Sequence, residues 1–135
     1  MDFLWFELYD KAKEKLNASC ISPFIEYGNN SCAILGSNNK IYSGISITSN
    51  SNINCSAEKS AISSMLNDGE KIIKRIVILN ELEEIIEPSE ESLEYLLELC
   101  ENADDLEVLI DLDRKIVKSL KNLLPDWWGT YRNLK

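Results

Sequence analysis

Hydrophobic residues recur along this chain at helical spacing in some stretches and as short continuous runs in others, which predicts helices alternating with strands. Residues 3–17 place apolar side chains on one helical face and charged ones on the other, so an amphipathic first helix is expected. The stretch 24–30, FIEYGNN, is predicted to be a loop. The apolar runs 31–35 and 41–47 flank a connector rich in Gly and Asn, and together they predict a β-hairpin.

The second half of the chain continues this alternation. A helix is predicted over 57–66, where small and apolar residues repeat on one face until an Asn-Asp-Gly sequence ends it. The run 75–79 predicts a short buried strand, and a further helix begins after Pro88. Two strands, over 106–110 and 115–117, and a short C-terminal element complete the order.

The length and the element order together predict one domain. The 135 residues, of which 44% are hydrophobic, can bury a core but are too few for two ordinary domains, so 1–135 is assigned to a single domain. The order predicts an α/β fold, a three-layer α-β-α sandwich with a five-stranded mixed sheet and helices on both faces. The sequence has no run of about 20 apolar residues and no signal-peptide pattern, so a cytoplasmic protein is expected.

The chain contains no histidine, and this absence narrows the chemistry that it can perform. Ser-His and Cys-His nucleophile pairs, a His general base and zinc sites with imidazole ligands are excluded. Any catalytic chemistry must therefore use carboxylates, hydroxyls, Lys, Tyr or cysteines. No C-x-x-C pair occurs, which excludes a compact zinc knuckle, and Cys32 and Cys100 lie in apolar patterns typical of buried free thiols. The other two cysteines are Cys20 and Cys55.

Charge is distributed unevenly along the chain. The formal net charge is −9, which disfavours a general nucleic-acid or membrane partner. Residues 81–113, called the acidic segment below, contain fourteen acids and no Lys or Arg, so the remainder of the chain carries a charge of +5. Such a segment is either a solvated helix face with acidic loops or a docking surface for a basic partner.

Four segments, taken in order, resemble motifs of the cytidine deaminase family. They are NKIYSGISI at 39–47, SAEKSAISSMLNDGEKIIKRIVIL at 56–79, PSEESLEYLLEL at 88–99 and LLPDWWG at 123–129. The family's corresponding motifs are a G-x-x-Y-x-G-x-N-V strand, a C-A-E-R-x-A helix start, a P-C-x-x-C-R-Q-x-L-x-E-F helix and a terminal L-L-P-x-x-F-G. The resemblance runs from about Ser22 to Gly129. It implies a five-stranded mixed sheet, a site at two helix N-termini, and assembly as a homodimer or homotetramer.

The chemistry implied by the resemblance depends on zinc. Family members hold the metal through one Cys or His at the start of the second helix and two Cys at the start of the third, while a Glu moves protons for attack on C4 of cytosine. By position, Glu58 matches the proton shuttle. Ser56, Ser89 and Ser92 match the three metal ligands. Because a serine hydroxyl is neutral and hard to deprotonate, we expect no metal and no other cofactor here.

Each of these residues also has a structural interpretation. Ser56 and Ser89 precede predicted helices, where a serine N-cap is favoured. Glu58 lies in a first helical turn, where an acid interacts favourably with the helix dipole. Alternatively, Glu58 is a buried carboxylate that moves protons or hydrogen-bonds a pyrimidine edge. Cys55 is a further alternative, as one ligand of an altered metal site.

The nucleoside-binding positions of the family differ here as well. Ser46 and Thr48 replace the Asn and Glu that read the ribose, and Leu93 replaces an Arg that follows the last thiolate. These changes disfavour conventional nucleoside deamination but leave a cleft for another small molecule. The residues expected to line this ligand pocket are Phe24, Tyr27, Ser46, Thr48 and Cys55.

Three functions from different classes follow from these observations. The favoured one is a zinc-free, inactive relative that binds a small molecule or a protein, with Trp127, Trp128 and Tyr131 at an oligomer interface or in the core. The second is a pyrimidine nucleoside deaminase with an altered metal site around Cys55 and Glu58. The third is a structural or docking protein that presents its acidic segment to a basic partner.

Overall fold

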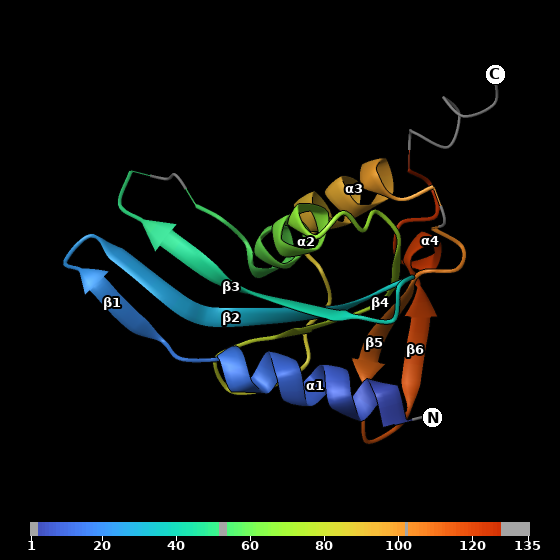
Figure 1. Ribbon diagram of the computed structural model, residues 1–135, viewed down its shortest axis with the longest axis horizontal. Helices are drawn as coiled ribbons and strands as arrows, with labels where there is room; N and C mark the ends of the chain where they lie inside the picture. Colours follow the sequence, from blue (N-terminus) through green and yellow to red (C-terminus); the bar gives the residue numbers. More distant parts are fainter. Residues whose placement is uncertain (1–2, 52–53, 102, 128–135) are drawn as a thin grey trace.

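A six-stranded mixed sheet lies between two layers of helices in the computed structural model of this protein (Figure 1). The structure describes residues 3–51, 54–101 and 103–127. No helix within these ranges is long and apolar enough to cross a membrane. The three-layer α/β sandwich predicted from the sequence is confirmed, with one strand more than the five expected.

Helices and strands alternate along the chain much as the hydrophobic pattern predicts. In order they are α1 (Phe3–Lys15), β1 (Ser19–Ser22), β2 (Ile25–Gly36), β3 (Ile41–Ser49), α2 (Ala57–Asn67), β4 (Ile73–Leu79), α3 (Glu90–Leu99), β5 (Glu107–Asp111), β6 (Ile116–Ser119) and α4 (Leu120–Leu123).

The long strand β2 organises the sheet. One edge of β2 pairs with β3 along most of its length, and the other edge pairs first with β1 and then with β4, all antiparallel. The strand β5 runs parallel to β4, and β6 pairs antiparallel with β5. Because a parallel pair requires a crossover connection, α3 carries the chain from β4 to β5.

Alternating side chains of the central strands fill two cores, one on each face of the sheet. Ala33 and Leu35 of β2 pack with α1, whereas Cys32 and Ile34 pack with α2 and α3. Figure 1 shows the same division, with α1 on one side of the sheet and α2 and α3 on the other. The core beneath α1 consists of Trp5, Leu8, Ala12, Ala33, Leu35, Val77, Leu79 and Leu109.

The prediction of a loop over 24–30 is wrong, because β2 begins at Ile25. The strand β1, which pairs with this first part of β2, was not predicted at all. Gly28 has a φ of +79° beside an irregularity in the β2–β3 register, and its carbonyl accepts a hydrogen bond from the N–H of Asn17. Backbone pairing therefore holds this stretch as a strand although its side chains mix apolar, polar and charged types with a glycine.

The remaining predicted elements are confirmed, with ends that differ by a few residues. The first helix ends at Lys15 instead of 17, and the strand expected over 75–79 begins at Ile73. The last two strands start one residue later than predicted. Differences of this size are ordinary, since helix and strand ends fray.

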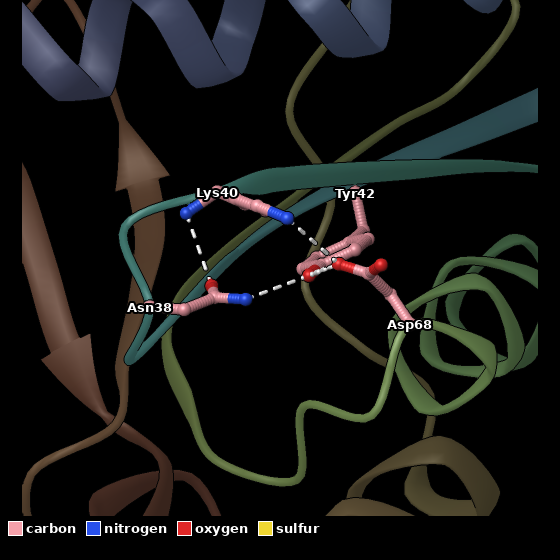
Figure 2. Close-up of polar contacts among 4 residues, drawn as sticks. All are labelled: Asn38, Lys40, Tyr42 and Asp68. Atoms are coloured by element: carbon pink, nitrogen blue, oxygen red, sulfur yellow. Dashed lines mark hydrogen bonds and ion pairs between the residues drawn. The ribbon is translucent and has the colours of Figure 1, made fainter.

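A polar cluster fastens the β2–β3 hairpin to the end of α2 (Figure 2). Tyr42 Oη donates to Asp68 Oδ2 at 2.5 Å, and Lys40 Nζ lies 3.4 Å from the same oxygen. Asn38 Nδ2 donates to Tyr42 Oη at 2.8 Å. The hydrogen bonds from Tyr42 and Lys40 lower the pKa of Asp68, and its carboxylate in turn raises the pKa of Tyr42. The cluster therefore requires an ionised Asp68 and a protonated Tyr42.

Replacing Tyr42 by Phe is expected to destabilise the fold only in the middle of the pH range. Because the pKa of Asp68 is lowered in the folded state, its contribution is complete above the unfolded carboxyl pKa of about 3.9 and is lost as pH falls through the folded pKa. The raised pKa of Tyr42 makes its contribution complete below about 10, and that contribution is lost as pH rises. Urea midpoints of wild type and Tyr42→Phe should differ most between about pH 5 and 9.

The matched control for this experiment is Tyr9→Phe. Tyr9 Oη also donates a hydrogen bond between elements, but its acceptor is the backbone carbonyl of Glu83, at 2.9 Å. A carbonyl does not titrate, so the effect of Tyr9→Phe should not shrink in acid. If the urea midpoints of Tyr42→Phe and wild type differ as much at pH 3 as at neutral pH, the ionised Asp68 is not what makes the contact of Tyr42 favourable.

Candidate functional site

Serine residues cap the N-termini of both α2 and α3. Ser56 Oγ accepts a hydrogen bond from the backbone N–H of Lys59 at 3.2 Å, and Ser89 Oγ accepts one from the N–H of Ser92 at 3.3 Å. Both caps have extended backbone, as N-cap residues do. The two hydroxyls therefore satisfy backbone donors that a helix start leaves without an intrahelical partner.

The third serine, Ser92, is buried and bonded to the carboxylate of Glu58. Ser92 Oγ donates to Glu58 Oε2 at 2.5 Å, and the two side chains are only 6% and 7% exposed. Ser92 belongs to the first turn of α3 and Glu58 to the first turn of α2. A side-chain hydrogen bond thus joins the starts of the two helices directly.

Cys32 of β2 lies in the core close to Glu58. Its side chain is fully buried. Burial raises the pKa of the Cys32 thiol well above 9.0, and the negative charge of Glu58 raises it further. Because a thiolate and not a thiol binds metals and attacks electrophiles, Cys32 supplies neither function at neutral pH.

A cavity of about 230 Å³ opens where the two helix starts face β3. It gathers six residues that the sequence singled out, three at the family's ligand positions and three from the predicted ligand pocket. We call it the serine-lined cavity. Its lining consists of Ser46, Ile47, Thr48, Asn54, Cys55, Ser56, Lys59, Ser89, Glu91 and Ser92.

Lys59 and Glu91 connect the two helices at the serine-lined cavity. Lys59 Nζ lies 4.0 Å from Glu91 Oε1 and 5.3 Å from the centre of the Tyr95 ring. The Lys59 side chain is 41% exposed and that of Glu91 88% exposed, so the ion pair is solvated and weak. The cavity lining therefore contains one cation and one anion, and Glu58 is linked to it through the hydrogen bond from Ser92.

Two residues expected in the ligand pocket do not line this cavity. Phe24 is 64% exposed and lies in the turn between β1 and β2. Tyr27 pairs with Ile47 across β2 and β3 but is not among the residues that line the cavity. Leu93, at the position of the family's Arg, is buried in the core.

Lys59, Asn54, Glu91 and Ile47 line the cavity but were not singled out from the sequence. Two of these residues could have been predicted from their sequence positions. Lys59 is three residues after the Ser56 cap, and Glu91 lies between Ser89 and Ser92, so helical geometry places both near the helix starts. Ile47 and Asn54 lie at the cavity because a β-bridge joins Ile47 to Cys55, and the side-chain pattern alone does not predict this bridge.

The acidic segment falls on two parts of the surface. Glu90, Glu94 and Glu98 are exposed along α3, as the solvated-face interpretation predicts. Others line a second cavity of about 440 Å³ on the α1 side of the molecule. Its lining consists of Tyr9, Glu83, Glu84, Ile85, Ile110, Asp111, Leu112 and Asp113.

Of the C-terminal aromatic residues, Trp127 is half-buried and packs against the core shared by α2 and α3. Trp128 and Tyr131 lie outside the described residues. Their role at an oligomer interface stays a prediction.

The sequence has no significant match among models of known protein families. It has none among curated proteins either. Solved structures, in contrast, match over almost the whole chain. A cytidine deaminase from Mycobacterium tuberculosis gives a TM-score of 0.78 at 18% identity and covers 95% of this chain and 99% of its own. The chain has a cytidine deaminase-like fold.

Two further solved structures support the assignment of the cytidine deaminase-like fold. A cytidine deaminase from Burkholderia pseudomallei gives a TM-score of 0.70 at 24% identity, covering 91% of this chain and 98% of that one. The cytidine deaminase from Bacillus anthracis gives a TM-score of 0.72 at 20% identity, covering 96% and 93%. The fold resemblance that the four motifs indicated is therefore confirmed.

The serines of this site do not suit zinc. Zinc in proteins takes thiolate, imidazole or carboxylate ligands, whereas Ser56, Ser89 and Ser92 offer neutral hydroxyls. Each hydroxyl is also hydrogen-bonded to another protein group. Within the described ranges, no group of three or more Cys, Asp or Glu side chains is arranged to hold a metal ion. We therefore derive no step of chemistry through a metal.

Proposed function

We propose that this protein is a zinc-free member of the cytidine deaminase-like fold that binds a small polar molecule in the serine-lined cavity and does not deaminate cytidine. One observation carries the proposal. The three serines at the family's ligand positions lie around a single cavity, and each is engaged by a backbone N–H or by Glu58. This arrangement supports a binding site at the two helix starts in which hydroxyls stand where the family has metal ligands.

The state of Glu58 supports the same proposal. A proton shuttle in this family acts on a water activated by the metal. Here the carboxylate instead accepts a hydrogen bond from Ser92 at the position of a metal ligand. Without a metal-activated water, the family's route for hydrolysis of a cytosine amidine does not run through this residue.

The cavity indicates what kind of ligand it takes. Its volume of about 230 Å³ lies below the roughly 300–1,000 Å³ of pockets for drug-sized molecules, so the ligand is small. Hydroxyls, one amide and a Lys-Glu pair offer both donors and acceptors around it. A compact molecule with several hydrogen-bonding groups, of about nucleobase size, fits this lining.

Metal analysis and a cytidine assay test the proposal together. We expect the purified protein to hold far less than the roughly one zinc ion per chain of a catalytic site, and the absorbance of cytidine to stay constant on incubation with it. Stoichiometric zinc that disappears in Cys55→Ser, together with conversion of cytidine, would establish an altered metal site and overturn the proposal.

Ligand binding is tested by thermal unfolding with cytosine, uracil, cytidine and uridine as probes. A probe present at 100 times its Kd stabilises the fold by about 2.7 kcal/mol, which gives a clear rise in Tm. Thr48→Trp, which fills the mouth of the cavity from β3, should abolish the rise, whereas Thr48→Val should keep the cavity open. A rise that survives Thr48→Trp places the ligand elsewhere.

A further inference from the structure

We propose that Ser92 and Glu58 form a nucleophile and general-base pair that takes an acyl group from a small ester in the serine-lined cavity. The proposal goes beyond ligand binding and rests on the same cavity as the proposed function. It needs no metal and no histidine. A hydroxyl and a carboxylate are among the few catalytic groups that this sequence retains.

The first observation is the geometry of the pair. Ser92 Oγ donates a hydrogen bond to Glu58 Oε2 at 2.5 Å, within the roughly 2.5–2.7 Å typical of a hydroxyl bonded to a carboxylate, so the base is in contact with the hydroxyl. Both side chains are more than nine-tenths buried, yet Ser92 contributes to the lining of the cavity. The residue that carries the hydroxyl therefore contacts a base and borders a space for a reactant.

The second observation is that no other buried serine of the described ranges has this arrangement. Ser31 is fully buried and also donates a short hydrogen bond, at 2.6 Å, but its acceptor is the backbone carbonyl of Ala12, which is not a base. Ser56 and Ser89 line the cavity, but their oxygens accept hydrogen bonds from backbone N–H groups. Ser92 alone combines a carboxylate partner with a position on the cavity.

The third observation is the position of Ser92 in the first turn of the ten-residue helix α3. Backbone N–H groups of a first helical turn have no intrahelical acceptor, and the helix dipole favours negative charge there. The oxygen of an ester carbonyl becomes negative when a nucleophile adds to its carbon. Because the N–H of Ser92 itself donates to Ser89 Oγ, we assign the stabilisation of that charge to the positive end of the α3 dipole, at whose start Ser92 lies.

The reaction follows from these roles. Ser92 Oγ forms a bond to the ester carbonyl carbon while its proton passes to Glu58. The bond from that carbon to the alkoxy oxygen then breaks, and the alcohol leaves with the proton from Glu58. Water attacks the acyl-serine with Glu58 again as base, which releases a carboxylic acid and restores the Ser92 hydroxyl.

The test uses p-nitrophenyl acetate and the full-length chain. We expect a burst of about one p-nitrophenolate per chain, and peptide mapping should place the acetyl group on Ser92. Ser92→Ala should abolish the burst. Glu58→Gln keeps an acceptor oxygen for the hydrogen bond but removes the base, and should slow acetylation about 100-fold. Ser64→Ala, on the exposed face of α2, should react as wild type does.

Peptide mapping of the folded wild type decides the matter even if a variant does not fold. The proposal is overturned if Ser92 stays unmodified or if acetylation is confined to surface lysines. It is also overturned if a folded Glu58→Gln variant is acetylated at the same rate as wild type. The result is separate from the proposed function. Zinc-containing protein with an acetylated Ser92 would contradict the proposed function alone, whereas zinc-free protein with an unmodified Ser92 would contradict this inference alone.

Discussion

A variant carrying Ser56→Cys, Ser89→Cys and Ser92→Cys is expected to bind about one zinc ion per chain. The three positions already lie around one cavity, so the substitutions would bring three thiolates together at two helix starts, where negative charge is favoured. Structural zinc sites built from thiolates bind with apparent free energies on the order of 10 kcal/mol at neutral pH. The free energy gained from zinc binding should far exceed the stability lost with two serine caps, which contribute about 1 kcal/mol each. Competition with a chromogenic chelator measures the affinity.

The control for the zinc experiment is Ser63→Cys with Ser64→Cys. These two residues are exposed on α2, away from the cavity, and test whether added thiols alone capture metal. If the triple variant binds no more zinc than this control, the three serines are not arranged as the family's ligands are. Such a result would remove the main support for the proposed function.

Gly44→Ala is expected to destabilise the fold by about 3 kcal/mol or more. A Cβ atom on Gly44 would lie 2.3 Å from the backbone nitrogen of Ala61 and 2.7 Å from the carbonyl carbon of Ser60. Both atoms belong to the backbone of α2, so no side-chain rotation relieves the clash. The helix would have to move away from β3 and take Glu58 with it. Urea unfolding measures the loss of stability. The hydrogen bond between Glu58 and Ser92 should weaken as well, because Glu58 moves with α2.

Gly69→Ala is the matched control, because it isolates backbone strain from a clash. Gly69 has a φ of +84°, yet a Cβ there would meet nothing within 4 Å. The expected cost is about 1–2 kcal/mol, from the left-handed conformation alone. If Gly44→Ala and Gly69→Ala lower the free energy of unfolding equally, the clash at Gly44 costs little, and β3 and α2 can move apart at this point.

Where one local pattern dominates, the sequence is enough to predict the structure. The helices α2 and α3 start where a serine cap precedes apolar residues at helical spacing, and both caps are present as predicted. The first part of β2 was missed because backbone pairing with β1 on one side and β3 on the other, and not a pattern in its mixed side chains, makes it a strand. Periodicity reports how side chains are buried, and a segment held mainly by backbone bonds to its neighbours carries little of that signal.

The candidate site was predictable in part of its membership but not in its contacts. Position by position, the resemblance brought Ser56, Glu58, Ser89 and Ser92 to one place; the structure puts the three serines around one cavity and joins Glu58 to Ser92. The resemblance could not show that Ser92 donates to Glu58, because 34 positions separate them in the chain. Tyr27, expected in the ligand pocket, does not line this cavity, because which residues meet there depends on strand pairing and helix packing and not on the residue pattern alone.

Arg75 on β4 contacts both the first helix and the strand β5. Its guanidinium lies 4.8 Å from the centre of the Trp5 ring on α1, and its Nε lies 3.5 Å from Glu107 on β5. The strand pair that joins β5 to β4 is short, with the registers of Arg75 and Ile76 only. One side chain therefore links the helix layer on one face of the sheet to the short parallel strand pair, so loss of Arg75 should loosen α1 and β5 together.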